Sequence, residues 1–174
     1  MSKYIALAVS VGVLAVLATW LFGLDPLVAA KLQVWQAFIA WGCHFQSGGG
    51  FKGSRAAVVC MSWGALGGMG AVLLAGQIGV AGALAAPIAV GLGATLIVLS
   101  SKVPLLETIP ASVYGFAAIA GLILVGSVPA QDAIIPTILS VIIGAGFGYV
   151  SEALADALAK KTITAAEAAT TPAT

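Results

Sequence analysis

Charged residues are scarce in this chain. Lysine, arginine, aspartate and glutamate make up 7% of its 174 residues, whereas a soluble domain carries about 25%. The formal net charge is +1 and there is no run of basic residues, so nothing suggests nucleic acid as a partner. Hydrophobic residues make up 61% of the chain. This composition excludes an ordinary soluble domain and predicts an integral membrane protein surrounded by the lipid bilayer.

Residues that perform catalysis or bind metals are also few. The chain has one histidine and two cysteines, and both Cys43 and Cys60 fall in apolar segments, where a thiol is usually a small packing residue. Inside those segments there is no carboxylate pair, no histidine cluster, and no serine or cysteine beside a base at helical spacing. We therefore expect no enzyme activity, no metal site and no cofactor.

The few charges divide the chain at regular intervals. Charge-free stretches run over 4–24, 32–51, 56–101, 108–131 and 133–151. A helix needs about 20 mostly apolar residues to cross a bilayer, so the longest stretch holds two spans. The predicted fold class is therefore all-α, a polytopic membrane helix bundle of about six transmembrane helices. The predicted spans are 4–24, 29–46, 55–76, 79–100, 106–127 and 132–156.

Glycine and proline mark the expected breaks. The run Ser47-Gly48-Gly49-Gly50 separates the second and third spans. Pro87 stands in the middle of the fourth span and Pro110 at the start of the fifth, and proline removes a backbone donor from a helix. The fifth span thus has either an ordinary kink near the membrane surface or a short re-entrant element.

Positive charges favour one side of the membrane. With six spans and a cytoplasmic N terminus, the inner side carries Lys3, Lys52, Arg55, Lys102, Lys160 and Lys161. The outer side carries only Lys31, and this bias predicts both termini in the cytoplasm. We expect a single transmembrane domain over 1–161 and a disordered cytoplasmic tail over 162–174, which is small and polar.

The second span differs from the others because it has two unlike faces. One face is aromatic: Trp35, Phe38, Trp41 and Phe45. The opposite face is small and polar: Gln33, Gln36, Ala40, Cys43 and His44. An amide in hydrocarbon is costly unless it finds a partner, so the polar face should meet other helices or water.

Two interpretations of these polar residues remain open. Either they make hydrogen bonds between helices, or they line a solute path together with residues near the break in the fifth span. The candidate path residues are Gln33, Gln36, Cys43, His44, Ser112 and Tyr114. His44 is either a satisfied polar residue near a helix end or a proton sensor, and only its residue type favours the second role.

Two spans carry glycines at a spacing of four residues. These are Gly64 and Gly68 in the third span, and Gly144 and Gly148 in the sixth. Such pairs let helix backbones approach closely. They predict tight packing, either within one subunit or between the subunits of a homo-oligomer.

Two separate segments of the chain together resemble a known family. They are the segment from Trp35 and Phe38 through Phe45-Gln46-Ser47 to Gly48-Gly49-Gly50-Phe51-Lys52-Gly53, and the later segment Ile109-Pro110 with Gly115 and Ala118. They are similar to a family of small bacterial inner-membrane proteins catalogued as domain-of-unknown-function family 1097. The resemblance covers roughly residues 5 to 155 and implies a bacterial inner-membrane location but no established activity. Members have an aliphatic residue or another substitution where this chain has His44.

Two functions from different classes fit these observations. The first is a channel or passive transporter for a small neutral solute, since the family's size and helix count resemble half of a urea-channel-type transporter. Ion coupling usually requires buried acids or bases, whereas Asp25, Glu107, Asp132, Glu152 and Asp156 all fall at predicted span ends. The alternative is a membrane scaffold or accessory subunit whose glycine faces bind a partner.

Overall fold

Helices are the regular structure of the described part of the chain. The computed structural model describes the backbone of residues 2–170 and the side chains of residues 2–159. These residues form seven α-helices and two short 3-10 helices, and they contain no strand. The elements are α1 (Lys3–Phe22), α2 (Asp25–Ala29), α3 (Val34–Gln46), α4 (Gly50–Gln77), η1 (Gly79–Leu84), α5 (Ala85–Ser100), η2 (Pro104–Leu106), α6 (Ile109–Leu124) and α7 (Ala130–Thr170).

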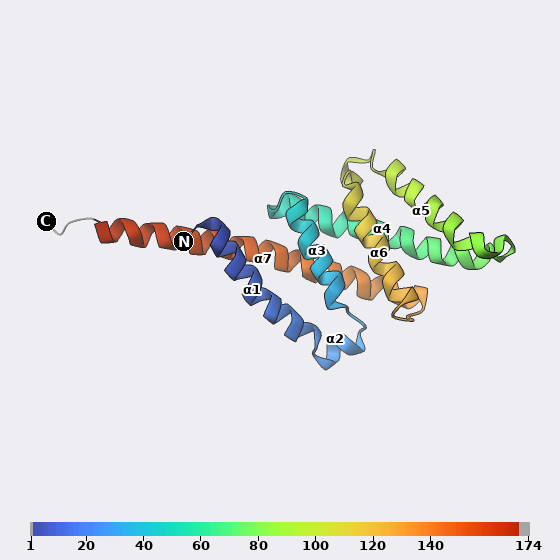
Figure 1. Cartoon of the computed structure of the whole chain (residues 1–174), viewed down its shortest axis with the longest axis horizontal. Helices are drawn as coiled ribbons and strands as arrows, with labels where there is room; N and C mark the ends of the chain where they lie inside the picture. Colours follow the sequence, from blue (N-terminus) through green and yellow to red (C-terminus); the bar gives the residue numbers. More distant parts are fainter. Residues whose placement is uncertain (1, 171–174) are drawn as a thin grey trace.

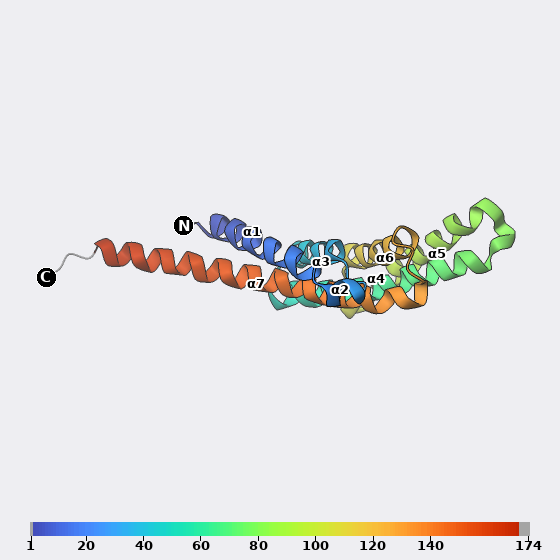
Figure 2. The same ribbon diagram turned by 90° about the horizontal axis from the view of Figure 1, so that it is seen from below.

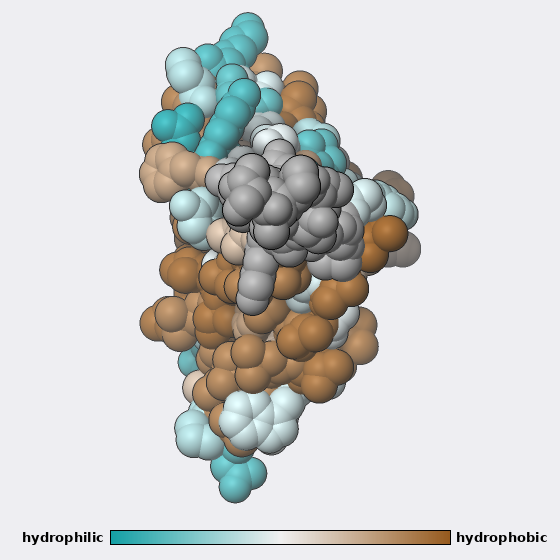
Figure 3. All heavy atoms as spheres, turned by 90° about the vertical axis from the view of Figure 1, so that its left-hand side faces the viewer, coloured by the Kyte–Doolittle hydropathy of each residue, from teal (hydrophilic) through white to brown (hydrophobic). Residues whose placement is uncertain are grey.

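The prediction of a multi-pass membrane helix bundle is confirmed. Four helical segments are long and apolar enough to cross a bilayer: Lys3–Phe22, Gly50–Gln77, Gly79–Ser100 and Ala130–Ala159. On the face shown in Figure 3, an apolar band lies between more hydrophilic ends of the molecule. The other two predicted spans are shorter helices than expected. At 1.5 Å per residue, the 13 residues of α3 extend for only about 20 Å.

The helices alternate in direction along the chain. Lys3 at the start of α1 pairs with Asp156 of α7 at 2.8 Å, and Lys31, beyond the end of α1, lies 4.0 Å from Asp132 near the start of α7. These two helices are therefore antiparallel. In Figure 1, α1, α3 and α6 run in a similar oblique direction and cross the long helices α4 and α7. Figure 2 shows that the molecule is thin, with α1, α3 and α6 on one side of α7.

The turn between α3 and α4 depends on its glycines. Gly48, Gly49 and Gly50 have φ of 97°, 69° and 55°, a region that other residues rarely adopt. This turn reverses the chain where the sequence predicted a break.

The prolines break their helices less than the sequence suggested. Pro110 lies in the first turn of α6, where its missing N–H is not needed. Pro87 lies inside the apolar segment Gly79–Ser100 as predicted, but it is the third residue of α5, where the backbone N–H has no partner within the helix. The irregular point of the fourth predicted span is instead Gly82, with φ 54° and ψ −127°, between η1 and α5.

The helices pack as two inverted halves. The first half is α1, the short helix α3 and the long helix α4, and the second is α5, α6 and α7 in the same order. Each short helix packs mainly on the long helix of the other half, α3 on α7 and α6 on α4. Likewise α1 packs on α7, and α5 packs on α4. Because each half has three helices that alternate in direction, the second half runs through the bundle in the opposite sense.

Individual contacts repeat between the halves. A Cβ on Gly64 would overlap the backbone of Ser112, and a Cβ on Gly144 would overlap the backbone of Ala37. One turn further on, Gly68 faces Ile119 and Gly148 faces His44. The long-helix glycines of the two halves are therefore 80 residues apart, and the short-helix residues that they meet are 75 apart. This regularity identifies equivalent positions in the two halves.

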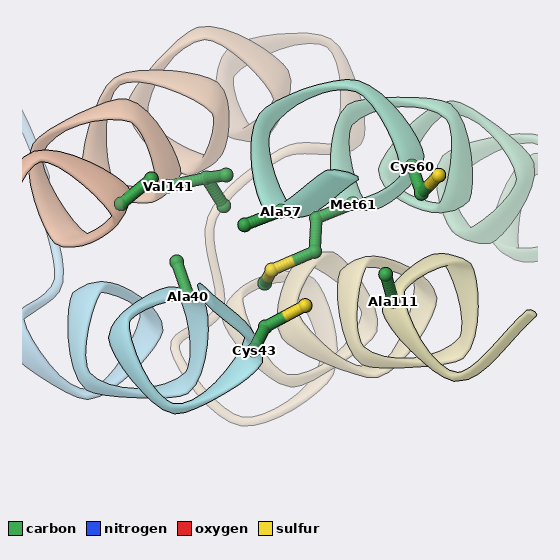
Figure 4. Packing of buried hydrophobic residues seen from close by; sticks show 8 residues of the cluster. Ala40, Cys43, Ala57, Cys60, Met61, Ala111 and Val141 are labelled. Carbon is green, nitrogen blue, oxygen red and sulfur yellow. The ribbon is translucent and has the colours of Figure 1, made fainter. Parts of the chain in front are cut away.

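The crossing of the four inner helices forms the main core. Ala40 and Cys43 of α3 meet Met61 of α4, Ala111 of α6 and Val141 of α7 (Figure 4). The Met61 side chain extends toward Cys43 of α3. Most of the other members are alanine or cysteine, which explains how two short helices and two long ones fit around one point.

The long C-terminal helix passes the predicted end of the membrane domain. The backbone of α7 is helical as far as Thr170 and projects beyond the bundle on the side of the N terminus (Figures 1 and 2). The boundary predicted at residue 161 therefore does not coincide with a helix end. Residues 171–174 of the predicted tail lie outside the described residues.

We predict that Gly64→Ala destabilises the protein, whereas Gly70→Ala on the same helix does not. The new methyl group of the first variant overlaps the Ser112 backbone and should cost about 2 kcal/mol or more. Gly70 has nothing within 4 Å, so its replacement should gain about 0.5–1 kcal/mol of helix stability. Unfolding in detergent micelles measures both, and equal stability of the two variants would contradict the close α4–α6 contact.

Candidate functional site

A line of polar contacts joins the short helix α3 to the long helix α7. The Gln33 backbone N–H donates to Ser140 Oγ at 3.0 Å, and Trp41 Nε1 donates to Ser151 Oγ at 3.1 Å. His44 Nε2 lies 3.3 Å from Glu152 Oε2. The partners are 107, 110 and 108 residues apart, so the two helices are parallel and in constant register.

Gln36 lies at the centre of the bundle and is fully buried. Its Nε2 donates to the Ala118 carbonyl at 2.9 Å and to Thr137 Oγ1 at 3.1 Å, so its amide joins α3, α6 and α7. Its Oε1 has no hydrogen-bond partner among the described residues. Gln36 thus connects three helices and retains one free acceptor.

His44 lies at the end of the bundle where α4 begins, and its side chain is fully buried. Its Nδ1 is 2.9 Å from Ser54 Oγ of α4, and its Nε2 faces Glu152 of α7. Glu152 Oε2 also accepts the backbone N–H of Gly50 at 2.6 Å. A histidine, a serine and a carboxylate from three helices therefore form one hydrogen-bonded cluster.

The remaining predicted path residues, Gln33, Cys43 and Tyr114, line two hollows between α3 and α6. Gln33 lines a hollow of about 400 Å³ together with Trp35, Gly121 and Val125. Cys43 and Tyr114 line a second hollow of about 330 Å³, in which Gln46 also takes part. Both hollows lie along the seam between the short helices α3 and α6, whereas Gln36, His44 and Ser112 are buried and line neither hollow.

Ser112 is buried at the contact between α6 and α4. Its backbone lies against Gly64, and its exposed fraction is 1%. Its hydroxyl has no hydrogen-bond partner among the described residues. Ser112 on one short helix and Gln36 on the other therefore each present one free polar atom.

The four predicted packing glycines are used within the subunit. Gly64 and Gly68 contact α6, and Gly144 and Gly148 contact α3. None of these four faces outward. The glycine pairs therefore explain the internal packing, and homo-oligomer formation stays a prediction.

Sequence reasoning missed most of the polar partners on α7. Thr137, Ser140, Ser151 and Glu152 bind the residues of α3 that the sequence singled out. The signal was present, because Thr137, Ser140, Gly144, Gly148 and Ser151 recur every three or four residues and form a small, polar stripe on one helix face. Glu152 was assigned to a helix end without a partner. In the described part of the chain, no group of three His, Cys, Asp or Glu side chains could hold a metal ion.

The fold and the buried polar contacts define a multi-pass helical membrane protein. A protein-family model described as "Protein of unknown function (DUF1097)" matches residues 8–156. The chain belongs to this family, as the sequence resemblance indicated. Comparisons with curated proteins and with solved structures find no match.

We predict that Gln36 and Thr137 stabilise the protein as a pair. Gln36→Leu and Thr137→Val each remove the hydrogen bond between α3 and α7, and such bonds contribute about 0.6 kcal/mol on average in membrane proteins. The double variant should therefore lose less stability than the sum of the single losses. A double-mutant cycle measured by unfolding in detergent tests this, and strictly additive losses would show that the bond contributes nothing.

Proposed function

We propose that this protein is a channel or passive transporter for a small neutral solute, and that it has no enzymatic activity. The observation that carries the proposal is the pair of inverted halves, whose short helices α3 and α6 meet at the centre of the bundle. Inverted repeats are common in membrane transporters, and their solute sites lie near the bilayer midplane where the repeats meet. A scaffold has no need of such an arrangement.

The polar atoms at this meeting point support a neutral solute. Gln36 Oε1 and Ser112 Oγ are buried without hydrogen-bond partners among the described residues. A buried unpaired polar atom costs free energy, so the presence of these two atoms favours a role in binding water or a polar solute. None of the buried side chains in the described part of the chain is an aspartate, glutamate, lysine or arginine. Uncharged hydrogen-bonding groups suit a neutral solute better than an ion.

The alternative of a scaffold loses its original support. That interpretation rested on glycine faces available to a partner, and the four glycines concerned contact α3 and α6 of the same chain. The seam between the short helices is open on its outer side, where the two hollows lie. We propose that a second copy of the chain in a homo-oligomer closes this side of the path.

We further propose a bacterial inner-membrane location with both termini in the cytoplasm. Lys3, Gly50 and Glu152 mark one end of the bundle, and Lys31 and Asp132 mark the other. Four of the basic residues at the first end are Lys3, Lys52, Arg55 and Lys102, whereas Lys31 stands at the second. The positive-inside rule therefore places the first end in the cytoplasm.

We predict that Ser112→Ala lowers solute flux and raises stability. The hydroxyl has no partner to lose, and relieving a buried unpaired group should stabilise the protein by about 1 kcal/mol. If the hydroxyl binds passing solute, the flux of urea or glycerol per inserted protein should fall several-fold. Light scattering from proteoliposomes measures the flux, and unfolding in detergent measures the stability.

Ser10→Ala is the matched control for this experiment. Ser10 is also buried, but its hydroxyl donates to Ala6 of its own helix at 2.9 Å, away from the seam. Its flux should equal that of the unmodified protein. Proteoliposomes that pass neither probe faster than protein-free liposomes would reject transport of this solute class. Unchanged flux in Ser112→Ala would remove that residue from the path.

We predict opposite sidedness for residues 2 and 80. Ser2→Cys and Val80→Cys, each in a Cys43→Ala, Cys60→Ala background, place single exposed thiols at the two ends of the bundle. A membrane-impermeant maleimide should label the thiol at position 80 in intact cells. It should label the thiol at position 2 only in inside-out vesicles. The reverse pattern would invert the proposed orientation.

A further inference from the structure

We propose that His44, Ser54 and Glu152 form a proton-binding site that controls the start of α4. The site joins the C-terminal end of α3, the first turns of α4 and the middle of α7. Its ligand is a proton from the adjacent aqueous phase. The inference goes beyond the proposed passive path and does not depend on it, because the site is complete within the described residues.

Hydrogen-bond partners are present for both protonation states of His44. In the neutral ring, Nε2–H donates to Glu152 and Nδ1 accepts the Ser54 hydroxyl. When a proton binds Nδ1, the new N–H donates to Ser54 Oγ. The Ser54 hydroxyl then turns to the Ala145 carbonyl, 3.5 Å away. Neither state leaves a ring nitrogen unpaired, so the buried ring can gain and lose a proton without an unsatisfied polar group.

The equivalent place in the other half of the bundle is apolar. Gly148 faces the His44 ring as Gly68 faces Ile119, and a Cβ on either glycine would lie 2.7 Å from the nearest side-chain atom. The residues 80 positions from Glu152 and Ser54 are Val72 and Ile134. Helix packing at this place therefore requires neither a histidine nor a carboxylate. The polar cluster is present at only one end of the bundle. It therefore calls for a role other than packing.

The partly exposed carboxylate of Glu152 connects the buried His44 ring to the aqueous phase. The Glu152 side chain is 30% exposed, whereas the His44 side chain is not exposed at all. Other charged groups surround the site. On α7, Asp156 pairs with Lys3 of α1, and Lys3 is also attracted by Glu152. On α4, Lys52 and Arg55 are exposed, and Cys43, the other titratable group of α3, contacts Ser47.

Proton binding should loosen the turn before α4. Glu152 Oε2 serves both the Gly50 backbone N–H and His44 Nε2. A cationic ring attracts this oxygen more strongly than a neutral ring does, and it competes with the neutral Gly50 amide. The turn is closely fitted to the carboxylate, since a Cβ on Gly49 would lie 2.7 Å from Glu152 Oε1. A shift of the carboxylate therefore reaches the glycine turn directly.

The single histidine makes the site directly observable. We would record nitrogen-15 spectra of histidine-labelled full-length protein in lipid nanodiscs between about pH 8 and about pH 5, with the Gly50 amide followed in parallel. At the basic end we expect the Nε2–H tautomer, and at the acidic end a doubly protonated ring. The Gly50 amide shift should move with the same midpoint. The proposal would be overturned if the ring stayed neutral throughout, or if the Gly50 amide shift did not change as the ring gained a proton.

Two variants test the role of the carboxylate. Glu152→Gln retains an acceptor oxygen but removes the charge, so the doubly protonated ring should appear only at lower pH than in the unmodified protein. Glu107→Gln removes an exposed carboxylate where α6 begins, at the same end of the bundle, and should leave the midpoint unchanged. An unchanged midpoint in Glu152→Gln would reject Glu152 as the partner. If that variant fails to fold, the titration of the unmodified protein still decides the proposal.

Discussion

The whole arrangement depends on two places where helix backbones touch. Gly64 of α4 lies against Ser112 of α6, and Gly144 of α7 lies against Ala37 of α3. In a membrane there is little hydrophobic drive to bring helices together, so close contact between small residues must supply the attraction. These two contacts hold each short helix on the long helix of the other half. Larger side chains at either place would separate the halves and open the core around Met61.

The ends of the short helices need hydrogen-bond partners, and polar side chains supply them. A helix of 13 residues such as α3 cannot reach both membrane surfaces, so its ends lie near the hydrocarbon and need partners. Ser140 bonds the backbone at the start of α3, and His44 near its end bonds Ser54 and Glu152. Polar side chains on α7 and α4 thus take the place of water at both ends of α3. The same bonds fix its register on α7.

Much of the fold could be predicted because charge and hydropathy are periodic along the chain. The six helical segments and the break at Ser47–Gly50 follow from local signals alone. The lengths of α3 and α6 could not be read in the same way. Apolar residues such as Leu32 continue beyond the helix ends, and hydropathy does not distinguish a helix from an apolar connection. The irregular point at Gly82 was also missed, and because α5 begins only after it, Pro87 lies in the first turn of that helix and does not break it.

The candidate site was harder to predict because its residues come from distant segments. Gln36 and His44 could be singled out from the uneven faces of one helix. Their partners Thr137 and Glu152 lie about 100 residues later, and only the register of α3 on α7 brings them together. The inverted halves were hidden for the same reason. Equivalent positions such as His44 and Ile119 share a place in the packing but no side-chain chemistry.

The difference between His44 and its equivalent, Ile119, shows that helix packing at this place does not require a polar residue. Ile119 satisfies the packing against Gly68 through van der Waals contact alone, so the scaffold would accept an apolar residue at position 44 as well. His44, Ser54 and Glu152 instead bring three polar groups to one end of an otherwise apolar bundle, and burying them carries a desolvation cost. Only the end of the bundle where α4 begins bears that cost. The proposed proton site therefore has no counterpart in the other half, where the corresponding residues are Val72, Ile119 and Ile134.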